Sequence, residues 1–191
     1  MEQFKRTIML LGKEKFQKLY NSHVLIVGVG GVGGYVAEFL VRTGVNNLTI
    51  VDQDVVDVTN LNRQVIATHS TINTPKVNAF KARLLDINPK LNINCIHERV
   101  SDKNSEQILL SDKFDYVVDA IDSTKDKIDL ICKAKNLKIP IVSALGAGNR
   151  IGTPNYEIKD IYKTSDDGLA RVMRKSLREH GVESLDVGIT N

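Results

Sequence analysis

Residues 23–33 read HVLIVGVGGVG, an apolar run followed by a glycine-rich turn. The run is apolar after its first residue, as expected of a strand that is covered on both faces of a sheet. The turn has the form G-x-G-x-x-G at Gly28, Gly30 and Gly33, with Gly31 between them. Glycines in such a turn let backbone N–H groups approach phosphate oxygens at a helix N-terminus, where the helix dipole favours an anion. The stretch therefore predicts the first strand of a nucleotide-binding α/β fold.

Strand-like and helix-like segments alternate along most of the chain. Apolar periodicity and flanking turn residues predict strands over residues 23–29, 48–52, 93–99, 116–119 and 139–144. They predict helices over residues 8–19, from the glycine turn to Gly44, from Thr74 and Pro75 to Asn88, over 105–111, and around Ile128 and Cys132. Repeated β-then-α units predict an α/β fold with a doubly wound, mostly parallel, Rossmann-like sheet. Ligands of such sheets bind beyond the carboxyl ends of the strands.

The pattern changes after Gly148. We expect a strand over 156–162 without a following crossover, a helix over 169–180 and the beginning of a strand at 189–191. A chain of 191 residues suits one α/β domain. We divide it into an N-terminal helical segment (1–22), a nucleotide-binding core (23–150) and a substrate-side extension (151–191).

Composition excludes few classes of protein. The net charge of +3 is only mildly basic, so charge alone does not indicate a nucleic-acid binder. No apolar run is long enough to span a bilayer, and the N-terminus lacks the apolar stretch of a secretion signal. The two cysteines, Cys95 and Cys132, form neither a disulfide framework nor a metal-ligand spacing. We therefore expect a protein of the reducing cytoplasm.

Asp52 ends the strand that follows the glycine turn, where a carboxylate can accept hydrogen bonds from ribose hydroxyls. The glycine turn and Asp52 together indicate a nucleotide but not which one, because NAD-dependent oxidoreductases show the same pair. The next segment, 52–64, reads DQDVVDVTNLNRQ and ends with an asparagine, an arginine and a glutamine. A triphosphate needs such cationic and polar donors, whereas a nicotinamide has no evident use for them.

Lys76 and Asp122 each admit a functional and an ordinary interpretation. Lys76 lies in the first turn of its helix, where the dipole disfavours a cation, so an anion bound there would explain it. The alternative is a solvated lysine. Asp122 follows the strand 116–119 and is placed to hold Mg²⁺ beside phosphates. Its alternative is the N-cap of the next helix, a task that Ser123 can also perform.

Five pieces of the sequence, 28–33, 52–54, 60–64, 75–76 and 119–122, resemble in order the adenylating domain of ubiquitin-activating enzymes and of their bacterial relatives that activate sulfur-carrier proteins. The resemblance implies a single adenylating domain with ATP and Mg²⁺ as cofactors. It implies that Asp52 binds ribose, that Arg63 and Lys76 hold the phosphates with help from Asn60, and that Asp122 binds Mg²⁺. The cofactor-binding residues it implies are Gly28, Gly30, Gly31, Gly33, Asp52, Asp54, Asn60, Arg63, Gln64 and Lys76. It further implies a homodimer in which Arg6 of one subunit reaches the ATP of the other.

Three later segments, 143–150, 160–164 and 167–169, resemble one branch of that superfamily, the tRNA threonylcarbamoyladenosine dehydratases. Gly168 departs mildly from that branch, which more often has proline there. Sulfur-carrier activators usually carry two Cys-x-x-Cys pairs for zinc and often a catalytic cysteine, and this sequence has neither. Cys95 and Cys132 both fit apolar packing positions. Because family members usually run tens of residues further, we expect the chain to be truncated.

The helix over 169–180 carries a basic face. Arg171, Arg174, Lys175 and Arg178 follow i, i+3, i+4, i+7 spacing. We expect Leu169, Val172, Met173 and Leu177 to form the opposite, buried stripe. A basic face suits an RNA phosphate backbone but equally an ordinary solvated helix, and the resemblance favours tRNA.

The resemblance implies ATP-dependent dehydration of threonylcarbamoyladenosine in tRNA, through activation of a carboxylate, with a sulfur-relay protein as a further possible partner. The nearest alternative is an adenylyltransferase that activates the C-terminus of a ubiquitin-like sulfur carrier. A nicotinamide oxidoreductase and an inactive RNA- or protein-binding module are alternatives of other classes.

Overall fold

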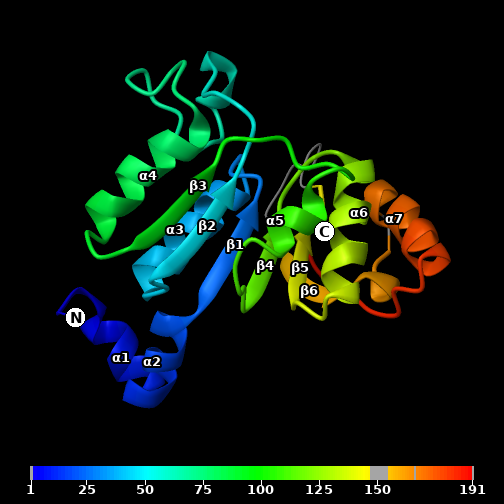
Figure 1. The fold of residues 1–191 in the computed structure, drawn as a ribbon, viewed down its shortest axis with the longest axis horizontal. Helices are drawn as coiled ribbons and strands as arrows, with labels where there is room; N and C mark the ends of the chain where they lie inside the picture. The colour runs from blue at the N-terminus through cyan, green and yellow to red at the C-terminus, as the bar shows by residue number, and fades with distance from the viewer. Residues whose placement is uncertain (1, 147–154, 166, 191) are drawn as a thin grey trace.

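The computed structural model of the chain describes residues 2–146, 155–165 and 167–190. The described strands form one seven-stranded sheet in the order β3-β2-β1-β4-β5-β7-β6 (Figure 1). The strands are β1 His23–Val27, β2 Asn47–Val51, β3 Asn92–Ile96, β4 Tyr116–Asp119, β5 Ile141–Ala144, β6 Tyr156–Asp160 and β7 Asp186–Thr190. Neighbouring described strands pair in parallel, except that β6 and β7 are antiparallel. The predicted doubly wound, mostly parallel sheet is confirmed.

Helices cover both faces of this sheet (Figure 1). One face carries α3 (Gly33–Thr43) and α4 (Lys76–Ile87), and the other carries α5 (Ser105–Leu109), α6 (Thr124–Asn136) and α7 (Gly168–Glu179). Successive residues of β1 point to opposite faces, so Val24 and Ile26 enter one core while Leu25 and Val27 enter the other. The apolar run of β1 therefore fits a strand buried on both sides.

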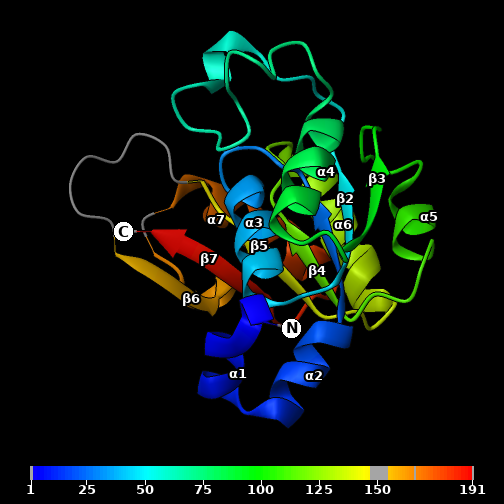
Figure 2. The same cartoon turned by 90° about the vertical axis from the view of Figure 1, so that its left-hand side faces the viewer.

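The N-terminal segment differs from the prediction of one helix over 8–19. After a 3₁₀ turn (Glu2–Phe4) the chain forms α1 (Lys5–Leu11) and α2 (Lys13–Asn21), which are separated at Gly12. Gly12 has a φ of 80°, a conformation that glycine adopts without strain and that ends the first helix. Both helices lie at the end of the sheet opposite the long segment that joins β2 to α4 (Figure 2).

Gly44 ends α3, as predicted, and its lack of a side chain also allows α2 to pack closely against it. Its φ is 122°, and a Cβ at this position would lie 2.6 Å from a ring carbon of Phe16. Phe16 is buried and packs against Phe4, with ring centroids 5.6 Å apart. The N-terminal segment is thus anchored by aromatic packing against the turn between α3 and β2.

Several strand ends lie inside the predicted limits. β1 ends at Val27 rather than at 29, because Gly28 already has a φ of 88° and begins the turn. β3 ends at Ile96 rather than at 99, and β6 ends at Asp160, where a 3₁₀ turn (Ile161–Lys163) follows. The strand expected to begin at 189 is β7, which starts at Asp186 and lies between β5 and β6. Among the described residues no helix combines the length and hydropathy needed to cross a bilayer.

Candidate nucleotide-binding site

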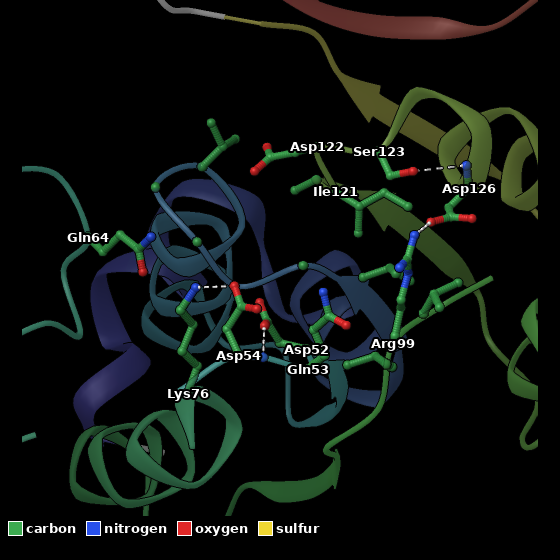
Figure 3. Close-up of a pocket in the computed structure, with 18 of the residues that line it drawn as sticks. Asp52, Gln53, Asp54, Gln64, Lys76, Arg99, Ile121, Asp122, Ser123 and Asp126 are labelled. Carbon is green, nitrogen blue, oxygen red and sulfur yellow. Dashed lines mark hydrogen bonds and ion pairs between the residues drawn. The ribbon is translucent and has the colours of Figure 1, made fainter. Parts of the chain in front are cut away.

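A pocket of about 880 Å³ lies beyond the carboxyl ends of β1, β2 and β4. Its walls are the glycine turn, the segment after β2, the start of α4, the residues after β3 and the turn between β4 and α6 (Figure 3). The location agrees with the rule that doubly wound sheets bind ligands at this edge. Among the predicted cofactor-binding residues, the pocket is lined by Gly28, Gly30, Gly31, Asp52, Asp54, Asn60, Arg63, Gln64 and Lys76.

The glycines of the turn divide into two kinds. A Cβ on Gly28 would lie 2.7 Å from the carbonyl oxygen of Ala120, and one on Gly33 would lie 1.9 Å from the carbonyl oxygen of Gly28. These two glycines are needed for close packing of β1, α3 and β4. A Cβ on Gly30 would meet nothing nearer than 3.6 Å, and Gly30 and Gly31 both line the pocket. They leave backbone open to a ligand, which is the use of glycine that phosphate binding requires.

Asp52 joins the end of β2 to the glycine turn. Its Oδ2 accepts the backbone N–H of Val29 at 2.8 Å, and its Oδ1 accepts that of Asp54 at 2.8 Å. A carboxylate has about four acceptor sites, so two of these bonds leave capacity for hydroxyl donors in the pocket. Its side chain is therefore held in place on the wall where ribose binding is predicted.

Lys76 is buried, with 4% of its surface exposed. Its Nζ lies 2.8 Å from Oδ2 of Asp54, whose side chain is half-exposed, and both residues line the pocket (Figure 3). The interpretation of Lys76 as a solvated lysine is wrong, because the fold buries the residue at the start of α4. A buried cation beside a pocket attracts an anion more strongly than one in water, since the local dielectric is lower.

The segment before Arg63 is a compact capped turn. The Asn60 side chain is buried and accepts the backbone N–H of Asp57 at 3.1 Å, while Asp57 accepts the N–H of Thr59 at 2.8 Å. Hydrogen bonds from the Thr59 side chain and backbone lower the pKa of Asp57. Arg63 is exposed and its Nη1 donates to the Thr59 carbonyl oxygen at 3.1 Å. The turn thus supports an arginine at the mouth of the pocket.

Gln64 carries an unpaired acceptor. The residue is 7% exposed and lines the pocket, and its Oε1 has no hydrogen-bond partner among the described residues. A buried acceptor without a partner costs about 1–3 kcal/mol. A ligand hydroxyl or amine in the pocket would remove that cost.

The sequence left open whether Asp122 or Ser123 caps the helix that follows β4, and the structure assigns the cap to Ser123. Ser123 is the N-cap of α6, and its hydroxyl oxygen accepts the backbone N–H of Asp126 at 3.4 Å. Asp122 is exposed on the pocket wall and has no ionic or hydrogen-bond partner within the described part of the chain (Figure 3). Its carboxylate is therefore available to a ligand.

The predicted site residues did not include the ion pair of Arg99 and Asp126, both of which line the pocket. Arg99, just after β3, donates from Nη2 to Oδ2 of the buried Asp126 at 3.0 Å (Figure 3). The two residues lie 27 positions apart in the sequence, and no local pattern connects them. The available signal was a cation at the last position of the strand predicted over 93–99.

The four predicted RNA-binding residues lie on α7, away from the pocket lining. Arg171 and Lys175 are exposed, whereas Arg174 donates to the backbone and side-chain oxygens of Thr164. The guanidinium of Arg178 lies 4.8 Å from the centroid of the Tyr162 ring. Two members of the basic face therefore also hold the segment that precedes α7.

The predicted buried stripe of α7 is wrong at Val172. Val172 is 55% exposed, and the buried residues are Ala170, Met173 and Leu177, with Leu169 partly buried against the same core. Ala170, Met173 and Leu177 follow i, i+3, i+7 spacing, which defines one face of a helix. Val172 lies about 100° around the helix from Met173 and so falls outside that face.

Arg6 does not join the pocket of its own chain. It is exposed on α1 and lines a surface hollow of about 670 Å³ with Lys5, Met9 and Leu10. Helix α1 lies at the end of the sheet opposite the segment that bears Arg63 (Figure 2). Within one chain the structure does not bring Arg6 together with Lys76.

The sheet is doubly wound, and its pocket is lined by the glycine turn, a fixed carboxylate and a buried lysine. These features define the class of α/β proteins that bind nucleotides. Residues 4–153 match the ThiF family, and the chain belongs to that family.

The similarity extends beyond the family domain. The tRNA threonylcarbamoyladenosine dehydratase of Bacillus subtilis is 40% identical over 183 residues, which cover 96% of this chain and 72% of that protein. The enzyme of the same name from Escherichia coli is 36% identical over 177 residues, covering 93% of this chain and 66% of that protein. The crystal structure of the E. coli enzyme in complex with ATP superposes with a TM-score of 0.93 at 33% identity, covering 100% of this chain and 81% of the other. The predicted relationship to this branch of the superfamily is confirmed.

Proposed function

We propose that the chain catalyses the ATP-dependent dehydration of N6-threonylcarbamoyladenosine in tRNA. The observation that carries the proposal is the extent of the similarity. The ThiF family domain ends at residue 153, whereas the similarity to the B. subtilis dehydratase covers 96% of the chain and therefore extends over β6 and into α7. A merely shared adenylating domain would not require likeness in this C-terminal part.

Lys76 and Arg63 are the groups proposed to hold the phosphates. Lys76 supplies a buried ammonium at the start of α4 and Arg63 an exposed guanidinium at the pocket mouth. Asn60, buried in its capped turn, fixes the segment that bears Arg63. Cations placed in advance stabilise the charge that develops on phosphate oxygens when the substrate carboxylate attacks the α-phosphorus.

Asp122 is the residue proposed to bind Mg²⁺ beside the nucleotide phosphates. Mg²⁺ is usually held by one or two carboxylates together with substrate phosphates and water. Asp122 offers one unpartnered carboxylate on the pocket wall, and the described residues contain no cluster of three or more His, Cys, Asp or Glu side chains suited to hold a metal alone. When bound, Mg²⁺ would supply charge neutralisation at the phosphates.

The proposed chemistry needs no nucleophile from the protein. The threonyl carboxylate displaces pyrophosphate from the α-phosphorus, and the carbamoyl group of the same substrate then attacks the activated acyl carbon. Ring closure expels AMP, which carries away one former carboxylate oxygen, so the net change is the loss of one water. The pocket residues bind the nucleotide and orient the acyl group for the intramolecular attack.

This function is tested by incubating the purified protein with Mg·ATP and tRNA bearing threonylcarbamoyladenosine. The nucleosides are then analysed by mass spectrometry. We expect an ATP-dependent loss of the mass of one water, accompanied by AMP. An unchanged nucleoside together with pyrophosphate exchange that requires a carrier protein ending in Gly-Gly would support the sulfur-carrier adenylyltransferase instead.

Neither cysteine is expected to take part in a thioester. Burial raises the pKa of both the Cys95 and the Cys132 thiol, so both are protonated at neutral pH and poorly nucleophilic. Each packs against one of the two cores, as predicted. We expect the double variant Cys95→Ala/Cys132→Ala to keep kcat within about twofold of wild type, because it removes only packing and the weak hydrogen bond from Cys95 to the Val77 carbonyl oxygen. A folded double variant that forms no product would contradict the proposed route.

We further propose a cytoplasmic homodimer in which Arg6 serves the partner's active site, with a sulfur-relay protein as a candidate partner. Arg6 is exposed and lies beside Met9 and Leu10, which are 77% and 83% exposed. Exposed large apolar side chains next to a free arginine suit a contact with a second subunit.

The basic face of α7 is proposed to bind tRNA phosphates. Arg171 and Lys175 are exposed, so their replacement removes charge without loss of internal contacts. We expect Arg171→Ala and Lys175→Ala each to weaken tRNA binding and to reduce the slope of log Kd against log salt by about 1. Binding titrations at several salt concentrations measure this slope. Lys113→Ala, at an exposed position before β4, is the matched control, and an equal change there would contradict the assignment to α7.

A further inference from the structure

Lys127 is a charged side chain inside the core. It lies on α6 and is 1% exposed, on the same buried face of the helix as Leu130, Ile131 and Ala134. Lysine is almost never fully buried unless it is paired. Lys127 does not line the nucleotide pocket, so the proposed chemistry leaves it without a task.

Three acceptors surround the Lys127 ammonium. Its Nζ lies 2.7 Å from Oδ2 of Asp119, 3.2 Å from Oγ of Ser143 and 3.0 Å from the carbonyl oxygen of Ala144. An ammonium group has three N–H donors, so every donor is used. Because Asp119 ends β4 and Ser143 and Ala144 end β5, this one side chain joins α6 to the carboxyl ends of two neighbouring strands.

Asp119 extends the connection to the pocket wall. Its Oδ2 also accepts the hydroxyl of Ser143 at 2.6 Å, and its Oδ1 accepts the backbone N–H of Ile121 at 3.3 Å. Ile121 belongs to the turn 120–123, whose four residues all line the pocket and include Asp122. The carboxylate of Asp119 therefore fixes the turn from the buried side, while Asp122 lines the pocket.

The cluster of Lys127, Asp119 and Ser143 is not a second catalytic centre. Asp119 and Ser143 are both 0% exposed, and the Ser143 hydroxyl donates to Asp119. A substrate cannot reach these groups, so they act only through the residues that they hold.

The neighbouring residue on α6 makes the complementary connection. Asp126 accepts a hydrogen bond from Arg99, which follows β3 and also lines the pocket. The first turn of α6 is thus bonded to the chain beyond β3 through Asp126, and to the ends of β4 and β5 through Lys127. Buried ion pairs are often replaceable by apolar residues without loss of stability, so stability alone does not account for such an arrangement.

We propose that Lys127 is a positioning residue of the active site: with Asp119 and Ser143 it holds the turn 120–123 so that Asp122 faces the phosphates. The inference rests on the proposed function, because the role of Asp122 is part of it. The physical basis of the proposal is that charged groups stabilise a transition state best when they are fixed in place before the reaction.

The double variant Asp119→Leu/Lys127→Met tests the proposal, because it removes both charges together and leaves neither unpaired in the core. We expect a folded protein in which kcat falls by about 10-fold or more while KM for ATP changes little. Amide hydrogen exchange in the turn 120–123 should become faster, and Mg²⁺ should strengthen ATP binding less than in wild type. Ser143→Ala, which removes one bond and no charge, should show the same changes to a smaller degree.

The matched control is Asp102→Asn/Lys125→Met, which removes the exposed ion pair between α6 and residue 102, with its 3.0 Å separation. It should leave exchange, Mg²⁺ dependence and kcat unchanged. Wild-type kcat and Mg²⁺ dependence in the folded double variant would overturn the proposal, and if that variant does not fold, wild-type behaviour of Ser143→Ala in all three measurements would do so. A wild-type protein that forms no dehydrated nucleoside overturns the proposed function instead, and the exchange and ATP-binding measurements still decide the role of Lys127.

Discussion

Replacement of Lys76 by methionine is expected to lower kcat for dehydration by about 10²–10³-fold, the loss typical when one fixed donor to a charged transition state is removed. Lys76 is 4% exposed and its Nζ is held at the pocket by Asp54. Methionine keeps the apolar stem that packs in the core and removes only the ammonium. The Asp54 side chain is 53% exposed, so water can solvate it once its partner is gone, and the fold should survive.

Steady-state kinetics with ATP and modified tRNA, together with thermal unfolding, measure this effect. Lys81→Met is the matched control, because Lys81 is exposed on the same helix and does not line the pocket. The control should keep wild-type rates and a wild-type melting temperature. A folded Lys76→Met variant with wild-type kcat and KM would exclude Lys76 from the phosphate site.

The sheet could be predicted because each of its determinants is local. The apolar run of β1 indicates burial on both faces, and its alternate residues do enter the two separate cores. The glycine turn and Gly44 mark positions where the backbone requires a positive φ or close packing, and glycine supplies both. The location of the pocket then follows from the parallel order of the strands.

The structure departs from the prediction where contacts between residues far apart in the sequence determine the local conformation. Gly12 separates α1 from α2, although the apolar periodicity continues across it, because packing of Phe16 beneath Gly44 fixes the direction of the second helix. β7 contains a glycine and an aspartate and has weak strand character on its own, and its strand neighbours β5 and β6 determine its place.

In the candidate site, too, the local features could be predicted and the long-range contacts could not. Its glycines, Asp52, Arg63 and Lys76 stand in recognisable pieces of sequence, and all of these pieces border the pocket. The pairs that hold it together could not be found in this way, since Lys76 and Asp54 are 22 residues apart and Arg99 and Asp126 are 27 apart. One sign was available, because Lys127 continues the apolar stripe of its helix and a lysine there demands a buried partner.

Arg6 provides the second large effect, and it is expected to act across a dimer. Arg6→Ala alone should lower kcat by about 10²-fold or more, as for other groups that stabilise charge on phosphates. Arg6 lies on α1 and does not line the pocket of its own chain, so a direct role requires the pocket of a second copy. Lys5→Ala, at the exposed neighbouring position in the same hollow, should keep wild-type activity.

Two heterodimers, each purified through a different tag on each subunit, distinguish action in trans from action in cis. A dimer of Arg6→Ala with Lys76→Met retains one site that has both Lys76 and the partner's arginine, so we expect about half of wild-type activity. A dimer of wild type with the double variant Arg6→Ala/Lys76→Met places the intact lysine opposite the missing arginine, so it should be almost inactive. If Arg6 instead served its own chain, the first heterodimer would be inactive and the second would keep about half of the activity. Because the two arrangements predict opposite results from the same substitutions, loss of folding or of dimerisation in one variant cannot imitate either pattern.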